Sequence, residues 1–191
     1  MIVITGPSAS GKTATCLYLQ EHFGIRKVVT HTTRAMRVGE KNDVDYHFVT
    51  KEEFMKMKEN DEFVETVFYN GNYYGTSRKE VRIDKCMAVE LEGAKTYKSF
   101  GDPKIVLFFM NLDEEPCRQR MLQRGDDPVK VEARIQNDKG SFFLTDEMVK
   151  MIDVNVDTKK HDLASVSQFI YQKYLEILKQ RGIDFEESRK D

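Results

Sequence analysis

The chain of 191 residues is 40% hydrophobic and 32% charged, a composition typical of a globular protein and too apolar for a disordered one. Thirty Lys and Arg residues against 32 Asp and Glu give a formal net charge of -2, which provides no overall attraction for nucleic acid or an anionic membrane. The sequence has no apolar run of ~18 residues and no basic signal-peptide start, and its three dispersed Cys residues suit a reducing compartment. We therefore expect a cytoplasmic protein that binds neither nucleic acid nor membranes.

The first half of the chain alternates strand and helix patterns, starting from a β-branched run at the N-terminus. The expected elements are a strand at 2–5, a helix at 12–23, a strand at 28–29, a helix at 51–60, a strand at 62–69 and a hairpin-like turn at Asn70-Gly71. Residues 30–46 are polar and have little apolar periodicity, so they are interpreted as a functional loop.

The second half continues the alternation. It predicts a short charged helix at 77–85, strands at 87–91 and 105–110, helices at 113–123 and 131–139, a strand at 151–156 and a final helix at 163–178. Alternating strands and helices at both ends of the chain favour a parallel α/β core, interrupted by a β-rich insertion. We expect the last nine residues, 183–191, to form a frayed tail.

A phosphate-binding motif follows the first predicted strand. It fits GxxxxGK[ST] and comprises Gly6, Pro7, Ser8, Ala9, Ser10, Gly11, Lys12 and Thr13. The backbone N–H groups of such a loop and the helix N-terminus face phosphate oxygens, Lys12 adds a positive charge, and the Thr13 hydroxyl can ligate Mg²⁺. The motif predicts binding of a nucleoside triphosphate, but GTPases, motors and small-molecule kinases all share it.

A second anion site is indicated within residues 30–46. Arg34 and Arg37 are three residues apart, and with the Tyr46 hydroxyl they could clamp one phosphate. Glu65 lies in a predicted strand, and Tyr74-Gly75-Thr76 follows the tight turn. Taken singly, each arginine is better explained as a solvated surface charge, and the tyrosines are equally compatible with packing on an edge strand.

In combination, the segments GPSASGKT, THTTRAMRVGE with DYHFV, FVE and GNYYGT strongly resemble guanylate kinase from residue 1 to about 178. The resemblance implies a P-loop NTPase core with a five-stranded parallel sheet, a small β-rich GMP-binding insertion and a helical lid. The implied boundaries are 1–30 and 81–182 for the core, 118–140 for the lid within it, and 31–80 for the GMP-binding subdomain. The implied reaction transfers the ATP γ-phosphate to GMP or dGMP, with Mg²⁺, to give ADP and GDP.

The resemblance also assigns roles to individual residues. Arg34, Arg37, Tyr46 and Tyr74 would hold the GMP phosphate, and Thr30, Glu65 and Thr76 would meet the guanine edge. The GMP site would further include Gly75, Glu90 and Gly93. A carboxylate at Glu65 can accept bonds from both guanine N1–H and the exocyclic amine, whereas adenine has an acceptor at N1, so such a site can discriminate by ~10⁴ or more.

The donor side of the resemblance is the phosphate loop, extended to Ala14, together with a lid. Arg120, Arg124 and Arg134 would close over the triphosphate as catalytic groups beside Lys12 and Arg37, whereas Arg118 fits a charged helical face. Asn155 would lie near the adenine. We expect the chain to act on nucleotides as a monomer or homodimer.

The sequence departs from the family pattern at 88–92, where Ala88 replaces the first of two acids, Glu90 retains the second, and Glu92 replaces a usual Gln. Two alternatives therefore remain open: a diverged P-loop kinase for another phosphorylated small acceptor, and a non-catalytic guanylate-kinase-like module that binds phosphopeptides. The intact Lys12-Thr13 pair argues against the second, because such modules usually carry a degraded phosphate loop.

Overall fold

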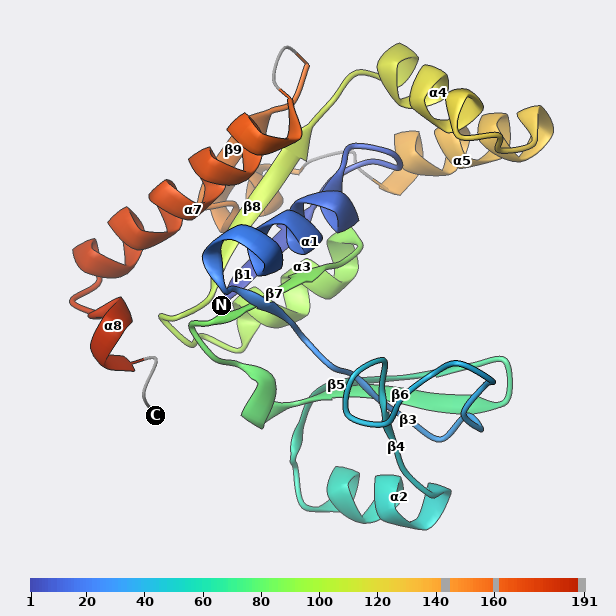
Figure 1. Ribbon diagram of the computed structural model, residues 1–191, viewed down its shortest axis with the longest axis vertical. Helices are drawn as coiled ribbons and strands as arrows, with labels where there is room; N and C mark the ends of the chain where they lie inside the picture. The colour runs from blue at the N-terminus through green and yellow to red at the C-terminus, as the bar shows by residue number, and fades with distance from the viewer. Residues whose placement is uncertain (142–144, 160–161, 189–191) are drawn as a thin grey trace.

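The computed structural model describes residues 1–141, 145–159 and 162–188 and contains two separate β-sheets (Figure 1). The first sheet has five strands in the order β2-β7-β1-β8-β9, and all of them are parallel, as expected from the alternating pattern. Its strands are β1 (Ile2–Thr5), β2 (Arg26–Lys27), β7 (Lys85–Ala88), β8 (Val106–Asn111) and β9 (Val154–Asp157). The predicted α/β class and the five-stranded parallel sheet are therefore confirmed.

Helices cover both faces of this sheet because the side chains of β1 alternate between two apolar clusters. Ile2 and Ile4 pack with residues of the first and the last long helix, whereas Val3 packs with Ala94 and Tyr97 on the opposite face. The helices of this part are α1 (Lys12–Phe23), α3 (Leu91–Ser99), α4 (Glu114–Gln123), α5 (Pro128–Ser141), α6 (Asp146–Met151), α7 (Leu163–Gln180) and α8 (Phe185–Ser188).

The second sheet lies within residues 31–77 and is built from four short strands in the order β4-β3-β6-β5. Its elements are β3 (His31–Thr32), β4 (His47–Phe48), α2 (Lys51–Glu59), β5 (Phe63–Tyr69) and β6 (Asn72–Ser77), and the short 3-10 helix η1 (Arg78–Glu80) leads back to the first sheet. Asn70 and Gly71 both have positive φ, as the predicted tight turn between β5 and β6 requires. Helix α2 starts with a capping box between Thr50 and Glu53.

Helices α4 and α5 form a hairpin that projects from the end of β8, near the loop that joins β1 to α1 (Figure 1). We call this α4–α5 hairpin the lid. Its two helices are joined by an apolar cluster in which Cys117 and Met121 of α4 meet Val131 and Ile135 of α5. The lid therefore has its own small core beside the main sheet.

Several predicted elements were wrong in place or type. The second strand is β2 at Arg26–Lys27 rather than 28–29, and the strand expected at 87–91 is β7 at Lys85–Ala88. Leu91 instead begins α3, a helix that the pattern did not predict. This helix buries Leu91, Ala94 and Tyr97, which recur every three residues and so lie on one face. Only the 3-10 turn η1 replaces the helix expected at 77–85.

Two further corrections concern the C-terminal part. The strand expected at 151–156 is shorter, because α6 takes its first residue and β9 begins at Val154. The frayed tail is also wrong for the residues that the structure describes, since α8 follows Gly182 and Phe185 is buried against α7 beside Tyr171 and Tyr174. Among the described residues, no helix combines the length and apolarity that crossing a bilayer requires.

Candidate active site

The phosphate loop joins β1 to α1 and lies close to the end of β8. Gly6 has φ +143°, and a Cβ there would lie 2.5 Å from the carbonyl oxygen of Met110. Gly11, at the start of α1, has φ +103°, which also favours glycine. The two motif glycines therefore allow the loop to pass close to the sheet and turn into the helix.

Lys12 lies over its own loop. Its Nζ donates hydrogen bonds to the carbonyl oxygens of Gly6 and Pro7, at 2.6 Å and 2.9 Å. Burial lowers the pKa of Lys12, and the neighbouring carboxylates of Glu90 and Asp138 oppose this shift. Glu90, the N-cap residue of α3, is thereby placed near the phosphate loop although it follows a different strand.

Two hollows adjoin the phosphate loop on the side of α1. The first, of about 430 Å³, is lined by Lys12, Thr13, Ala14, Arg120 and Arg124 among others. The second, of about 300 Å³, is lined by Ser10, Arg120, Thr158 and Asp162 among others. Arg120 lines both, and its guanidinium is 3.3 Å from the carbonyl oxygen of Ala9 and 3.4 Å from that of Thr158.

The other two predicted lid arginines share one carboxylate. Arg124 donates two hydrogen bonds to Asp126, at 2.8 Å and 2.5 Å, and Arg134 donates one at 3.1 Å. Arg118 instead contacts Glu114, Glu115 and Glu132 on the helix surface, as expected of a charged helical face. Asp126 therefore draws Arg124 and Arg134 together at the connection between α4 and α5.

Asn155 does not join this group. It lies within β9 opposite Phe109, its side chain is exposed, and it lines a hollow of about 410 Å³ that shares only Val166 with the hollow of Ser10 and Arg120. Thr158, three residues further along, lines the hollow of the phosphate loop instead. Thr158, rather than Asn155, therefore lies beside the phosphate loop.

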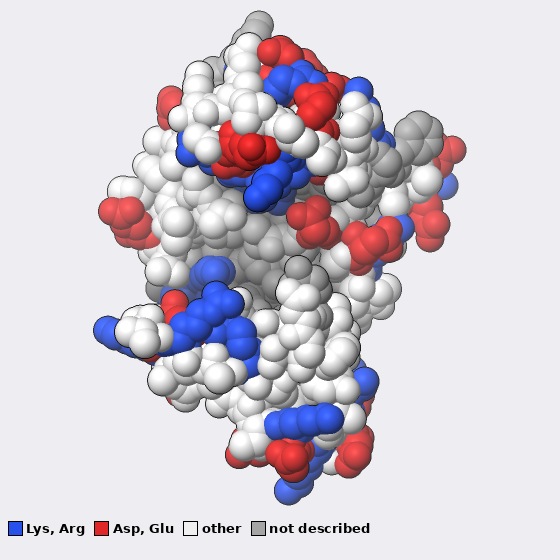
Figure 2. Space-filling model, turned by 90° about the vertical axis from the view of Figure 1, so that its right-hand side faces the viewer, with Lys and Arg blue, Asp and Glu red and all other residues white. Residues whose placement is uncertain are grey.

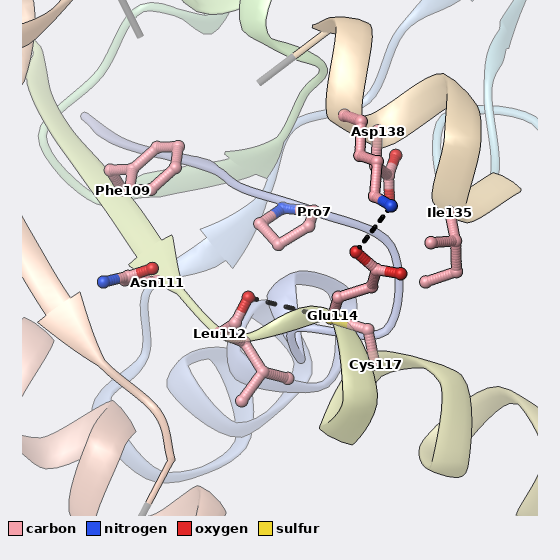
Figure 3. A pocket seen from close by; sticks show the side chains of 9 residues that line it. Pro7, Phe109, Asn111, Leu112, Glu114, Cys117, Ile135 and Asp138 are labelled. Carbon is pink, nitrogen blue, oxygen red and sulfur yellow. Dashed lines mark hydrogen bonds and ion pairs between the residues drawn. The ribbon is translucent and has the colours of Figure 1, made fainter. Parts of the chain in front are cut away.

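A further contact fixes the phosphate loop to the lid. The backbone N–H and the hydroxyl of Ser8 donate to the Asp138 carboxylate of α5, at 2.7 Å and 3.3 Å. Asp138, Pro7 and Cys117 line a cavity of about 200 Å³ on this side of the loop (Figure 3). Lid and loop therefore meet through the Asp138 carboxylate of α5 as well as through Arg120 of α4, which contacts Ala9.

The second sheet gathers the predicted anion-binding residues. The Arg34 guanidinium donates two hydrogen bonds to Glu40, at 2.7 Å and 3.0 Å, and lies 5.4 Å from the centre of the Tyr46 ring. Tyr74 meets Tyr46 edge to face, with ring centres 6.1 Å apart, and its hydroxyl is close enough to raise the pKa of Arg34 after Glu40. Arg37 is exposed, and its backbone N–H donates to Glu40 at 2.7 Å.

The predicted base-reading residues lie on the β5–β6 hairpin. Glu65 pairs with Thr76 across the ladder, and its Oε1 accepts a hydrogen bond from the Thr76 backbone N–H at 3.1 Å. Burial raises the pKa of the Glu65 carboxyl, whereas the Thr76 side chain and N–H oppose that shift. Gly75 is needed here, because a Cβ would lie 3.0 Å from the Glu65 carbonyl oxygen and 3.1 Å from the Phe54 ring.

Thr30 directly precedes β3, and Gly93 lies in the first turn of α3. The Thr30 carbonyl accepts a hydrogen bond from the His47 N–H at 3.0 Å, and a Cβ at Gly93 would lie 3.2 Å from Cβ of Val89. Tyr97 of α3 is 1% exposed, and the adjacent Thr76 side chain lowers its pKa against the larger effect of burial. Tyr97 therefore reaches from the main core to the hairpin that carries Glu65.

Figure 2 shows Lys and Arg side chains on both sides of a hollow between the upper and lower parts of the molecule. Contiguous sequence motifs contain most of the predicted site residues but not the residues that hold them in place. Glu40, Asp126, Asp138, Thr158 and Tyr97 belong to no local pattern, although Glu40 stands within the RAMRVGE segment where its spacing from Arg34 could have indicated a partner.

Comparison with known proteins gives consistent results. The family model described as guanylate kinase matches residues 1–132. A guanylate kinase of Fusobacterium nucleatum is 34% identical over 174 residues, covering 87% of this chain and 94% of the relative, and one of Chromohalobacter salexigens is 31% identical over 178 residues, covering 90% and 82%. The crystal structure of a guanylate kinase from Anaplasma phagocytophilum superimposes with a TM-score of 0.59 at 23% identity, covering 92% of this chain and 84% of that one, and supports the fold.

Proposed function

The chain belongs to the guanylate kinase family and is an ATP:GMP phosphotransferase, and we propose that its phosphate loop binds ATP while the second sheet binds GMP. The observation that carries this assignment is the pairing of two unlike sites. One combines Lys12 and Thr13 with lid arginines, and the other combines Arg34 and two tyrosines with the buried carboxylate of Glu65.

On the donor side, residues 6–14 hold the ATP phosphates through their backbone N–H groups and Lys12. Arg120 lines both hollows beside the loop, so it contacts the triphosphate and borders the space toward Thr158. We assign the adenine to the hollow of Ser10, Thr158 and Asp162 rather than to Asn155.

Mg²⁺ fits this donor site as a companion of the phosphates. Thr13 offers an exposed hydroxyl at the start of α1, and the described residues hold no group of three or more His, Cys, Asp or Glu side chains that could bind a metal alone. Mg²⁺ commonly takes few protein ligands and completes its shell with phosphate oxygens and water. When bound, it neutralises charge that develops on the phosphates.

On the acceptor side, Arg34, Arg37, Tyr46 and Tyr74 hold the GMP phosphate. Arg34 is oriented by Glu40 and by the Tyr46 ring, which fixes its planar guanidinium for a phosphate. Arg37 is exposed at the rim and can turn toward the same phosphate.

Guanine is recognised by Glu65 with Thr76 and Thr30. The ionised Glu65 carboxylate accepts from guanine N1–H and the exocyclic amine, and adenine cannot provide the first of these donors. Gly75 has no side chain and so allows close packing of the hairpin beside Glu65 and Phe54. Glu90 and Gly93 border the acceptor site from α3.

Transfer of the γ-phosphoryl group requires the two sites to align ATP and GMP. An oxygen of the GMP phosphate attacks the γ-phosphorus, the bond to the β-phosphate oxygen breaks, and ADP leaves. Lys12 and the lid arginines Arg120, Arg124 and Arg134 stabilise the charge on the transferred group, with Arg37 on the acceptor phosphate. Closure of the lid excludes water, which would otherwise accept the phosphoryl group.

The test is an acceptor screen with GMP, dGMP, AMP, UMP and CMP in a coupled assay of ADP release. We expect turnover with GMP far above that with AMP. No turnover with GMP would refute the proposal: turnover with another phosphorylated acceptor would favour the diverged kinase, and phosphopeptide binding without turnover would favour the binding module. The intact Lys12-Thr13 pair disfavours that module. We place the enzyme in the cytoplasm, acting on free nucleotides as a monomer or homodimer.

A further inference from the structure

A carboxylate of the lid is bound to the phosphate loop. Asp138 lies near the end of α5, and both of its oxygens are used: Oδ2 accepts from the Ser8 backbone N–H at 2.7 Å, and Oδ1 accepts from the Ser8 hydroxyl at 3.3 Å. Figure 3 shows Asp138 facing the loop beside Pro7. The two residues are 130 positions apart in the sequence, so the contact is purely tertiary.

The chemistry of this contact resembles that of a bound phosphate. The loop of residues 6–13 is a structure whose backbone N–H groups bind anions, and a carboxylate is an anion that accepts the same charge-assisted hydrogen bonds. Burial lowers the pKa of Lys12, and Asp138 opposes this shift, so its carboxylate acts on the phosphate-binding ammonium. An N–H group that already donates to a carboxylate is not available at full strength to a phosphate oxygen.

The neighbouring contacts determine what would move with Asp138. Ile135 of α5 packs against α4, and Lys139 pairs with Glu114 of α4 at 3.0 Å, so the two lid helices are held to each other. Arg134 is one helical turn before Asp138 and lies on the same side of α5. Of these two residues of α5, only Asp138 contacts the phosphate loop, whereas Arg134 is bonded to Asp126.

We propose that Asp138 competes with the donor phosphates for the phosphate loop and so sets the affinity for ATP. Binding of the triphosphate displaces the Asp138 carboxylate from Ser8, and this displacement frees α5 to bring Arg134 toward the phosphates. The proposal rests on the donor site assigned above. It is independent of the acceptor.

If Asp138 instead supports the conformation of the phosphate loop, its replacement changes the affinity for ATP in the opposite direction. If the carboxylate held the loop in its binding shape, its loss would weaken ATP binding. If the carboxylate competes with phosphate, its loss tightens ATP binding, because the Ser8 N–H is then free to donate to a phosphate oxygen. The sign of the change in affinity separates the two.

The experiment measures the dissociation constant of a non-hydrolysable β,γ-imido ATP analogue with Mg²⁺ by calorimetry, without GMP. Asp138→Asn keeps the size of the side chain and removes its charge, and we expect it to bind the analogue about tenfold more tightly than the unmodified chain. Asp138→Ala should change affinity in the same direction. Glu132→Gln, on the same helix but paired with Arg118, removes the same charge away from the loop and should leave affinity within about twofold.

Unchanged or weaker binding by Asp138→Asn, in a protein whose circular dichroism matches that of the unmodified chain, would overturn the proposal. A second measurement needs no variant. On titration with inorganic tripolyphosphate, the NMR signals of the Ser8 amide and the Asp138 carboxyl carbon should shift together to saturation. Binding of tripolyphosphate with an unchanged Asp138 signal would overturn the proposal, as would no binding of tripolyphosphate by either the unmodified chain or Asp138→Asn.

These results are separable from those of the acceptor screen. A chain that binds the ATP analogue more tightly after Asp138→Asn but does not phosphorylate GMP would refute the proposed acceptor and support the competition. A chain that phosphorylates GMP but shows no gain in affinity for the ATP analogue after Asp138→Asn would support the proposed acceptor and refute the competition.

Discussion

The Glu65 carboxylate accepts a hydrogen bond from the backbone N–H of Thr76, its partner across the β5–β6 ladder, at 3.1 Å. The position of the carboxylate is thus set by paired strands, directly after a shift in their register between Phe63 and Glu65. Burial makes the carboxylate costly to ionise, and the Thr76 side chain and N–H offset part of that cost. A group held in this way is suited to read a base.

Glu65→Gln should remove the preference for guanine. A Gln amide offers one acceptor oxygen, and its NH₂ group faces a donor of the base, so at least one buried group is left unpaired. We expect kcat/KM for GMP to fall by at least about a hundredfold, with little change in the KM for ATP. Steady-state kinetics with GMP and AMP measure the ratio, and an unchanged GMP to AMP ratio would contradict the role of Glu65.

The affinity for GMP should also depend on pH through Glu65. The ionised form binds guanine, and burial raises the pKa of this carboxyl above the ordinary Glu value of about 4.3. As pH falls through this raised pKa, Glu65 takes up a proton, and the KM for GMP rises earlier than an exposed Glu would cause. Because the phosphate of GMP itself titrates near pH 6, the control is Glu65→Gln, which should retain only the phosphate component. Identical pH profiles for both proteins would argue against this prediction.

Lys12→Ala should separate chemistry from acceptor binding. Lys12 lies over the phosphate loop, bonded to Gly6 and Pro7, while the acceptor residues lie on the second sheet. We expect kcat to fall about 10²- to 10³-fold, as for loss of one charge-stabilising donor, and the Kd for GMP measured by calorimetry to stay the same. Parallel loss of GMP affinity would show that the two sites are not separate.

Two arginines of α4 allow a site variant and its control to be compared on the same helix. Arg120 lines both hollows beside the phosphate loop, whereas Arg118, two residues earlier, contacts three glutamates on the helix surface. Arg120→Ala should lower kcat about 10²- to 10³-fold, and Arg118→Ala should leave it within about twofold. Similar losses in both variants would indicate damage to the helix rather than to the site.

The C-terminal segment should contribute to stability. Phe185 of α8 is 8% exposed and packs against Tyr171 and Tyr174, whereas Phe169 of α7 is 39% exposed. Phe185→Ala should lower the free energy of unfolding by about 3 kcal/mol, and Phe169→Ala by clearly less. Urea denaturation measures both. Equal losses would mean that burial of Phe185 adds nothing.

The sequence predicted those parts of the site that are written in contiguous segments. The phosphate loop follows from GPSASGKT because its spacing and its place between strand and helix are local. The hairpin that carries Glu65 and Thr76 follows from its Asn70-Gly71 turn, whereas the roles of these two residues come from the resemblance. The parallel sheet followed from alternation of strands and helices. These features depend on neighbouring residues, which a linear pattern records.

The features that escaped prediction depend on packing between distant segments. Helix α3 was missed because its buried residues, Leu91, Ala94 and Tyr97, make a short pattern interrupted by Gly93, and only the face of the sheet opposite α1 and α7 explains them. The contact of Asp138 with Ser8 spans 130 positions. Thr158 belongs to no sequence motif, because the sequence does not record where β9 ends relative to the phosphate loop.

Three of the predicted phosphate-binding arginines already have anionic partners within the protein: Arg34 pairs with Glu40, and Arg124 and Arg134 pair with Asp126. Phosphate recognition is therefore an exchange of one anion for another rather than the addition of a new ion pair. For each of these arginines, the free energy gained on binding is the difference between its pair with phosphate and its pair with a carboxylate. The strength of the arginine–carboxylate pairs therefore limits the affinity for phosphate. Ionic strength weakens both sides of this exchange alike. A protein with a net charge of -2 can in this way bind two polyanions without a basic surface.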